Sequence, residues 1–363
     1  MANPGRLRFN MIVNELERFS GWRRESSATG ALEDCSLIIA TYQRPAELAC
    51  LLQTLIDLPD APGEVVVVDG SPGDSSETKL LALTKERSLP FDLIYVRTPA
   101  GLTRQRNIGI DVCSGEYIFF LDDDCLPHAG YFKEIRRVFI EDQSGEVGAV
   151  GGLDMNGVNR PISLRWRIRL ALHLFPQLEP RIYHPAGTAI PDVMAEPFSG
   201  VRPIDVLSGF SMAFRRKVLD KHRFSEFFYG YAQGEDLEMS LRVRREWNIL
   251  WCGDARVVHN PAEGGRPTSF QKGRMEVRNR HFIWKRYSPD AALGDKLRFW
   301  LDMVFLILMD VACFAARPRR LGFLSHAAGV VWGIVSCIVL PPSYKEPPAR
   351  KKYDLCLSAV LGE

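Results

Sequence analysis

Short apolar runs alternate with amphipathic segments between residues 36 and 152, and this alternation constrains the fold more than any other feature of the sequence. The runs that have the composition of strands are 36–40, 64–69, 91–96, 116–121 and 147–150. Because they are apolar almost throughout, we expect both faces of the sheet to be covered. Helices are expected in the gaps, starting at Pro45, near Thr103 and after Pro127. This alternation predicts an α/β fold with a largely parallel sheet.

Polar side chains follow several of these runs directly, at the point where each run ends. They lie in the segments 41–44, 69–71, 97–98 and 122–124. Ligands of open parallel sheets bind beyond the carboxyl ends of the strands, so these side chains should converge on one edge. Asp122, Asp123 and Asp124 would repel one another there unless a cation lay between them. Carboxylate oxygens suit Mg²⁺ or Mn²⁺, which also bind substrate phosphates; a solvated acidic turn is the alternative.

Four segments, in this order, resemble the family 2 glycosyltransferases of the GT-A fold: Ser36–Pro45, Val66–Ser71, Arg104–Gly109 and Phe119–Asp124. The resemblance implies a Rossmann-like mixed sheet, flanked by helices, that binds a nucleotide-diphosphate sugar. It implies that the nucleotide sugar is bound by Thr41, Arg44, Asp69, Arg106, Asn107, Asp122 and Asp123. It also implies that Asp122 and Asp124 bind the metal. For Arg106, an ion pair with a core carboxylate is the alternative role.

The second half of the chain resembles the acceptor side of the same family. Val206–Arg216 is similar to the family's acceptor-loop strand, which gives Ser208 and Gly209 a place in that loop. Gly234–Arg242 is similar to the Gly-Glu-Asp motif, in which the Asp is the general base. Carried over, Asp236, with Glu235 beside it, removes the proton of the acceptor hydroxyl, and the anomeric carbon is inverted. Capping of a helix by these two carboxylates is the alternative.

Two further features bear on the site. His259 follows a strand-like segment, and the resemblance makes it a candidate metal ligand; a hydrogen-bonded histidine at the rim is the alternative. The segment 271–275 has Met where membrane-embedded synthases of the superfamily carry the Trp of a Gln-x-x-Arg-Trp motif. We therefore expect transfer of a single sugar.

The sequence predicts three parts: an N-terminal extension, residues 1–34, a GT-A catalytic domain, residues 35–285, and a C-terminal apolar region, residues 286–363. The catalytic domain divides into a nucleotide-binding half, residues 35–152, and an acceptor half, residues 153–285, in which residues 159–203 form an insertion at the rim of the active site.

The C-terminal region contains two apolar segments, residues 299–315 and 321–340, and the second is long enough to span a bilayer. Basic residues lie both between the segments and after them, so the positive-inside rule does not decide an orientation. Attachment to one leaflet avoids the conflict, with Arg298, Asp302 and Asp310 facing water. A true span, or packing as core helices or as an oligomer interface, are the alternatives.

Composition excludes several other classes of protein. A net charge of only +2 does not indicate a nucleic-acid binder. The eight cysteines are scattered without a Cys-x-x-Cys pair, which argues against zinc ribbons and disulfide scaffolds. Residues 1–24 carry charges throughout and do not read as a secretory signal, so a cytoplasmic protein, peripheral or monotopic at the inner face of the cell membrane, is expected.

The sequence therefore predicts a Mn²⁺- or Mg²⁺-dependent hexosyl- or deoxyhexosyltransferase of bacterial surface-polysaccharide synthesis. Its partners would be a nucleotide-diphosphate sugar donor, a glycan or lipid-linked acceptor and the membrane, and a homo-oligomer is compatible with this interpretation. Two alternatives stay open. A sugar nucleotidyltransferase would need a Gly-rich phosphate loop, which Thr41–Pro45 does not provide, and a non-catalytic membrane-associated nucleotide-sugar-binding protein would have no need of both acidic motifs.

Overall fold

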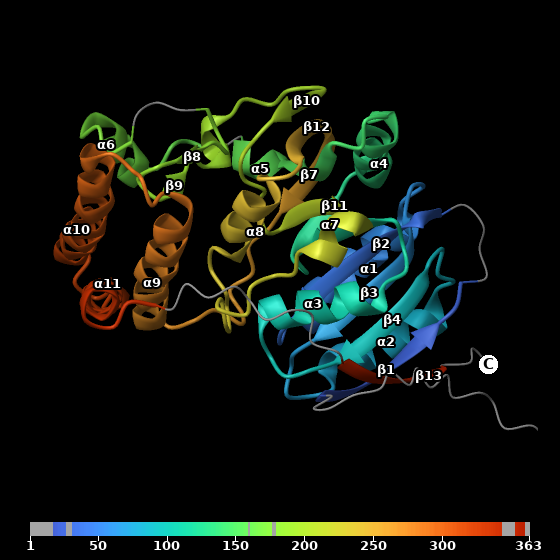
Figure 1. Cartoon of the computed structure of the whole chain (residues 1–363). Helices are drawn as coiled ribbons and strands as arrows, with labels where there is room; N and C mark the ends of the chain where they lie inside the picture. The colour runs from blue at the N-terminus through green and yellow to red at the C-terminus, as the bar shows by residue number, and fades with distance from the viewer. Residues whose placement is uncertain (1–16, 27–30, 159, 176–178, 343–352, 360–363) are drawn as a thin grey trace, which may run out of the picture.

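The protein is built around one large mixed sheet, seen in a computed structural model that describes residues 17–26, 31–158, 160–175, 179–342 and 353–359 (Figure 1). The strand order is β10-β12-β7-β11-β5-β2-β3-β4-β1-β13, and β6 pairs with β12. The parallel centre consists of β2 (Leu32–Thr41), β3 (Pro62–Asp69), β4 (Asp92–Arg97) and β5 (Tyr117–Leu121). These are four of the predicted runs, and the fifth lies in β7 (Val147–Asp154), so all five are confirmed as strands.

Helices cover both faces of the sheet, as the apolar character of the strands predicts. One face is covered by α1 (Pro45–Asp57), α2 (Ser75–Glu86) and α4 (Tyr131–Glu141), and the other by α3 (Leu102–Val112), α7 (Arg216–Lys221) and α8 (Glu235–Val243). Alternate strand residues serve the two cores: Leu37 packs with the first set of helices and Ile38 with the second. Packing on both faces therefore fixes the positions of the strand ends, where the predicted site residues lie.

The second half of the chain completes the sheet with strands of both directions. β11 (Ser211–Arg215) runs antiparallel to β5 and to β7, and β12 (Asn248–His259) runs parallel to β7. Two short strands, β6 (Cys125–Pro127) and β10 (Val201–Pro203), pair with β12. Between β7 and β11 lie the small elements α5 (Met155–Val158), α6 (Leu164–Ala171), β8 (Tyr183–His184), β9 (Thr188–Ala189) and η1 (Asp192–Met194). The predicted mixed sheet flanked by helices is thereby confirmed.

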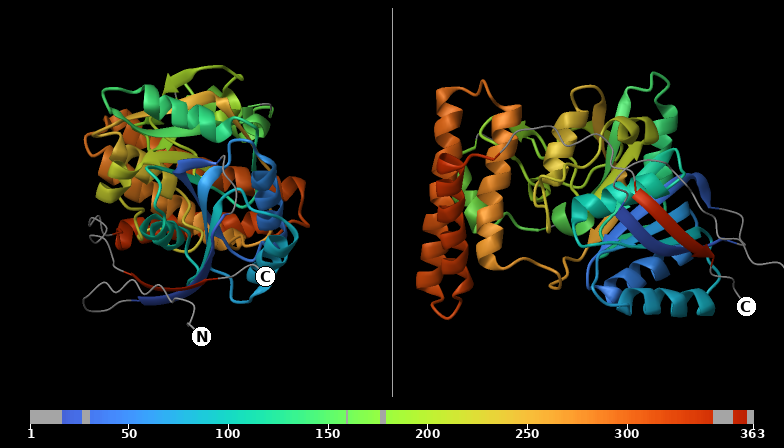
Figure 2. Two further views of the ribbon diagram at one scale, coloured as in Figure 1. Left: turned by 90° about the vertical axis from the view of Figure 1, so that its right-hand side faces the viewer. Right: turned by 60° about the horizontal axis from the view of Figure 1, so that its bottom comes forward.

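The far edge of the sheet is formed by the two ends of the chain. β1 (Glu17–Arg24) pairs antiparallel with β4 and parallel with β13 (Tyr353–Ala359), which lies beside it in Figure 2. Both strands fall in parts of the chain, 1–34 and 286–363, that the sequence placed outside the catalytic domain.

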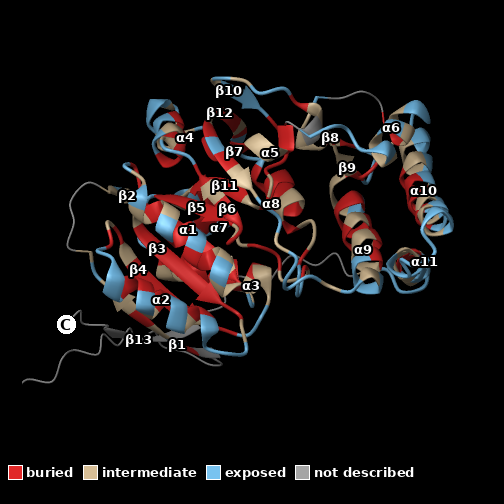
Figure 3. Ribbon diagram, turned by 180° about the vertical axis from the view of Figure 1, so that it is seen from behind, coloured by how far each residue is buried: buried red, intermediate tan, exposed pale blue. Residues whose placement is uncertain are grey.

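Three helices form a layer at the end of the molecule away from β1: α9 (Ser269–Tyr287), α10 (Leu293–Ala316) and α11 (Gly322–Val339) (Figure 1). Glycines let α9 and α11 cross closely, since a Cβ atom at Gly329 would lie 2.1 Å from the carbonyl oxygen of Phe270. By length and composition, α10 and α11 are each apolar enough to cross a membrane. Their outward faces are largely exposed (Figure 3).

The expectation that Asp302 and Asp310 face water is wrong, because both carboxylates are buried against the catalytic domain. Asp302 accepts from Arg169 of α6 at 2.7 Å and from Arg280 of α9 at 2.8 Å. Asp310 binds Arg165 of α6 and His326 of α11. Two arginines of the basic helix α6, together with Arg280 and His326, thus hold α10 in place.

Candidate functional site

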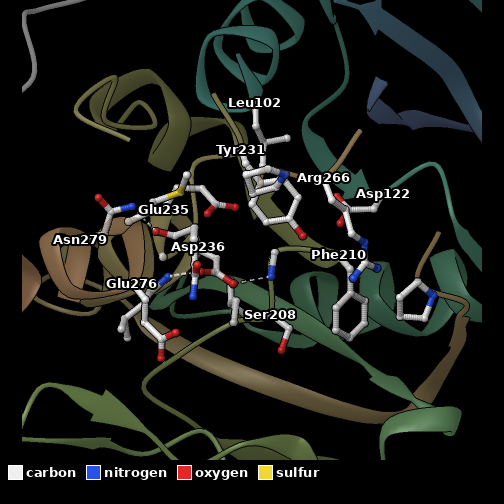
Figure 4. Close-up of a pocket in the computed structure, with 18 of the residues that line it drawn as sticks. Leu102, Asp122, Ser208, Phe210, Tyr231, Glu235, Asp236, Arg266, Glu276 and Asn279 are labelled. Atoms are coloured by element: carbon white, nitrogen blue, oxygen red, sulfur yellow. Dashed lines mark hydrogen bonds between the residues drawn. The ribbon is translucent and has the colours of Figure 1, made fainter. Parts of the chain in front are cut away.

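A pocket of about 1140 Å³ opens beyond the ends of β2 and β5 and extends to α9. Figure 4 shows Asp122 and Arg266 on one side of this pocket and Asp236 and Asn279 on the other. The predicted site residues that line it are Thr41, Arg44, Asp122, Asp123, Asp124, Ser208, Gly209, Glu235, Asp236 and His259. The mixed sheet thus brings the two acidic motifs, more than a hundred residues apart in sequence, to one cavity.

Asp123 is bound to the end of the neighbouring strand. Its Oδ2 accepts from the hydroxyl of Thr41 at 2.7 Å and its Oδ1 from Nη1 of Arg44 at 2.9 Å. Arg44 also donates to the carbonyl oxygen of Gly264 at 2.7 Å, so the loop after β12 is tied to the loop after β2. These three predicted nucleotide-binding residues therefore form a cluster that fixes the shape of the pocket at the β2 end.

Asp124 keeps one oxygen open. Its Oδ2 accepts from the backbone N–H of Ala262 at 2.9 Å, whereas its buried Oδ1 accepts no hydrogen bond from any residue within the described ranges. Nε2 of His259 lies 3.3 Å from that Oδ1. Burial opposes ionisation of Asp124, but the imidazole and the N–H of Ala262 lower the pKa of its carboxyl group. An ionised carboxylate oxygen that faces only the His259 imidazole fits a ligand of a divalent cation, with the imidazole nitrogen as a second ligand.

His259 and Cys125 complete a cluster whose ligand atoms, with those of Asp124, lie within 4.8 Å of one another. Phe210 stacks on the His259 ring at 4.5 Å and fixes its orientation. Burial raises the pKa of the Cys125 thiol well above its ordinary value, so this side chain stays protonated and is a poor ligand for Mn²⁺ or Mg²⁺. The oxygen and imidazole donors are the ones that suit these ions; the sequence did not single out Cys125 or Phe210.

Arg106 is buried beneath the pocket and contacts both acidic motifs. Its Nη1 donates to Oε1 of Glu235 at 2.7 Å, and its Nη2 donates to the carbonyl oxygen of Gly209 at 2.7 Å and to Asp122 at 3.2 Å. The arginine is 2% exposed. These contacts correspond to the alternative role of Arg106, an ion pair with a core carboxylate. The side chain of Asp122 remains 34% exposed.

Two other residues assigned to the nucleotide sugar lie outside the lining of the pocket. Asp69 accepts from the Tyr95 hydroxyl at 2.9 Å and from the N–H of Ser71 at 2.8 Å. The side-chain amide of Asn107 donates to and accepts from the backbone of Phe224, both at 2.9 Å. Their side chains fix the turn after β3 and the segment after α7, which no sequence pattern indicated.

Glu235 and Asp236 open α8 after Gly234, whose φ of 90° favours glycine. Asp236 is partly exposed to the pocket, and its Oδ2 accepts from the N–H of Gly209 at 2.8 Å. Glu235 is buried; burial and the charge of Asp236 raise the pKa of Glu235 to about 8, although Arg106 opposes the shift. Both carboxylates line the pocket, and Asp236 is the more exposed of the two.

Helix α9 forms one side of the pocket, and the sequence did not predict this. Arg274, Glu276, Arg278, Asn279 and Arg280 all line the pocket from this helix. Basic residues are spread around α9, so its sequence alone gives no signal of which side faces a cavity.

The sequence profile described as glycosyl transferase family 2 matches residues 36–223, more than half of the chain. An uncharacterized glycosyltransferase from Haemophilus influenzae is 33% identical over 89 residues, which are 24% of this chain and 29% of that protein. The hyaluronan synthase of Pasteurella multocida is 25% identical over 246 residues, 64% of this chain and 25% of the synthase. The chain thus covers less than a third of the length of either relative.

Among solved structures, the mannosyltransferase PcManGT from Pyrobaculum calidifontis, in complex with GDP-Man and Mn²⁺, superposes with a TM-score of 0.50 over 87% of this chain and 91% of that one. At 16% identity this likeness shows that the two proteins share a fold.

Proposed function

The chain belongs to glycosyltransferase family 2, and from this premise we propose that it transfers a hexosyl or deoxyhexosyl group from a nucleotide-diphosphate donor to a hydroxyl of a glycan or lipid-linked acceptor. The observation that carries the proposal is the convergence of Asp122, Asp124 and His259 with Asp236 in one pocket. The hyaluronan synthase among the relatives supports a role in bacterial surface-polysaccharide synthesis.

On the donor side, Asp122, Asp124 and His259 would hold a divalent cation, Mn²⁺ or Mg²⁺, whose charge stabilises the departing diphosphate. The open Oδ1 of Asp124 supports this assignment, and so does the Mn²⁺ in the complex of the structural neighbour. Thr41, Arg44 and Asp123 would border the nucleotide at the ends of β2 and β5, with Asp69 fixing the turn after β3. Arg106 and Asn107 then act by holding protein segments in place rather than by touching the donor.

On the acceptor side, Asp236 would take the proton of the attacking hydroxyl. The N–H of Gly209 holds one of its oxygens, and the N-terminus of α8 favours its charged form, so the carboxylate is oriented before the acceptor arrives. The hydroxyl oxygen attacks the anomeric carbon on the face opposite the diphosphate, which inverts that centre. Glu235 is engaged by Arg106 and positions the start of the helix.

We place the outer face of α10 and α11 on the inner leaflet of the cell membrane. Exposed apolar side chains cover that face: Leu301, Val304, Leu308, Val311, Val331, Trp332, Val335 and Ile338. The buried pairs of Asp302 and Asp310 join α10 to the catalytic domain on its other side. A helix pair that is held to the domain on one side and is apolar on the other fits attachment to one leaflet.

Two variants separate donor binding from transfer. A thermal-shift panel of nucleoside diphosphates, with and without Mn²⁺, should reveal a ligand that raises the melting temperature only with the metal. Asp124→Ala should lose that shift, whereas Asp236→Asn should keep it and lose transfer by a factor of about 10² to 10⁴. Asp290→Asn, an exposed carboxylate away from the pocket, is the matched control and should change neither.

Transfer is followed as release of nucleoside diphosphate from the matching nucleotide sugar. Release of pyrophosphate instead would identify a sugar nucleotidyltransferase. Full transfer by Asp236→Asn would move the base elsewhere, and the absence of any Mn²⁺-dependent nucleotide shift would refute the assignment of the donor site.

A further inference from the structure

Two arginines of α9, Arg274 and Arg278, lie one helical turn apart and line the pocket. Both are partly buried, and within the described part of the chain neither forms an ion pair with a carboxylate. Arg274 donates to the Tyr229 hydroxyl at 2.7 Å. Arg278 donates to the carbonyl oxygen of Phe227 at 3.3 Å and lies 3.8 Å from the centre of its ring.

The other arginines buried around this pocket are all neutralised. Each has a carboxylate oxygen within hydrogen-bond distance: Arg44 with Asp123, Arg106 with Glu235, Arg169 with Asp302, Arg181 with Asp192 and Arg280 with Asp302. The two remaining arginines of the lining, Arg160 and Arg266, are exposed and solvated. Arg274 and Arg278 are therefore partly buried cations whose charges repel and whose counter-ion the described protein does not supply.

The pair lies on the acceptor side of the pocket. Arg278 donates to Oδ1 of Asn279 at 3.0 Å, and Asn279 donates to the carbonyl oxygen of Gln233 at 2.6 Å, two residues before Glu235. The arginines are thus connected to the segment that leads into Asp236. Asp122, in the loop after β5, lies across the pocket from Asn279 (Figure 4).

The pair also lies close to the apolar surface. A Cβ atom at Gly329 of α11 would be 3.0 Å from the backbone nitrogen of Arg274, so α9 and α11 are in direct contact there. The opposite face of α11 exposes Val331, Trp332 and Val335. The width of α11, about 10 Å, therefore separates the backbone of α9 at Arg274 from the face assigned to the membrane.

We propose that Arg274 and Arg278 bind the phosphate or diphosphate of an acceptor whose sugar is linked through that group to a long hydrocarbon chain. Guanidinium groups match phosphate oxygens in geometry and charge, and a pair one turn apart can hold two of them. The sugar then reaches Asp236 while the chain runs along α11 to the membrane. This assignment rests on the proposed glycosyltransfer and narrows its acceptor to a lipid phosphate.

The test is binding of farnesyl diphosphate to the full chain, measured by calorimetry after the donor site has been filled with Mn²⁺ and the nucleoside diphosphate that gives the largest thermal shift. Farnesol and inorganic pyrophosphate are run beside it, to separate the chain from the phosphate. Farnesyl diphosphate should bind more tightly than either. Arg274→Gln combined with Arg278→Gln should weaken its binding by at least about tenfold.

The matched control removes two charges from a distant helix, Lys133→Gln with Arg137→Gln on α4, and should leave binding unchanged. Arg278→Lys keeps the charge without the planar fork and should fall between wild type and the double variant. Melting temperatures of all variants show that they fold.

Three results would overturn the proposal. Equal binding of farnesyl diphosphate by the double variant would mean that the arginines do not hold the phosphate, and equal binding of farnesol would mean that no phosphate is recognised. A loss of nucleotide affinity in the double variant would assign the pair to the donor diphosphate. If no nucleotide binds at all, the donor assignment has failed, and the same titration without nucleotide still tests the arginine pair.

Discussion

The crossing of α9 and α11 provides a sharp test of how the acceptor wall is held, through the substitution Gly329→Ala. The new methyl carbon would stand 2.1 Å from the carbonyl oxygen of Phe270 and 3.0 Å from the nitrogen of Arg274. Both are backbone atoms, so neither can rotate away, and the two helices must separate by roughly 1 Å to restore ordinary contact distances. Overpacking of this kind costs about 1–3 kcal/mol, and replacing Gly by Ala in a helix returns about 1 kcal/mol.

Because the obstruction is backbone, we expect the upper end of that range and a net loss of about 2 kcal/mol in the free energy of unfolding. For a chain of 363 residues this corresponds to a melting temperature lower by about 3 °C, measured by scanning calorimetry. Gly294→Ala in the first turn of α10 is the control, since the nearest atom to its Cβ is the flexible guanidinium of Arg298 at 3.6 Å. The control should be as stable as the wild type or more so.

The displacement should also be visible in function. Moving α9 shifts Arg274 and Arg278, so Gly329→Ala should weaken farnesyl diphosphate binding and leave Mn²⁺-dependent nucleotide binding unchanged. A variant as stable as Gly294→Ala, with unchanged binding of both ligands, would refute the close crossing on which this reasoning depends.

Two further predictions concern single side chains. Asn107→Ala should lower the free energy of unfolding by about 2–4 kcal/mol in urea titrations, because it leaves the N–H and C=O of Phe224 without partners; a fall in nucleotide affinity at unchanged stability would instead make it a donor ligand. Hydrogen bonds with Asp310 and Glu276 raise the pKa of His326 from 6.5 to about 9, so its stabilisation is complete below about pH 6.5 and is lost as the pH rises through 9. After allowance for partial solvent screening, we expect about 1–2 kcal/mol, seen as a larger fall in melting temperature between pH 6 and pH 10 for the wild type than for His326→Gln; identical falls would contradict it.

The centre of the fold was predictable from the sequence, because fully buried parallel strands leave a local signal. The run at 64–69 is apolar on both faces, and the structure indeed covers both. The edge at β1 was not predictable. Glu17–Arg24 mixes charged and apolar residues, and its place in the sheet depends on pairing with β4 and with a segment more than three hundred residues away.

The site divides in the same way. The acidic triplet could be placed from its position after a buried run. Which oxygen of Asp124 stays open depends on Ala262 and Arg44, which donate to its other oxygen and are distant from it in sequence. Asp302 and Asp310 appeared as polar breaks in an apolar helix. Their burial depends on arginines from α6, and no pattern within α10 indicates such partners.

The antiparallel strand β11 brings the proposed cation site and the proposed base, Asp236, to the same pocket. Its pairing of Ser211 with Leu121 sets the loop before β11 against the acidic triplet, and the N–H of Asp122 donates to the carbonyl oxygen of Phe210 at 3.3 Å. In the same loop, the N–H of Gly209 donates to Asp236. Arg106 donates both to the carbonyl oxygen of Gly209 and to Asp122, and so connects the two groups. The separation between the cation site and the base is therefore fixed by sheet register and one buried guanidinium. It follows that a substitution of Arg106 should impair transfer more than donor binding, since it disturbs the distance between two sites that can each still form.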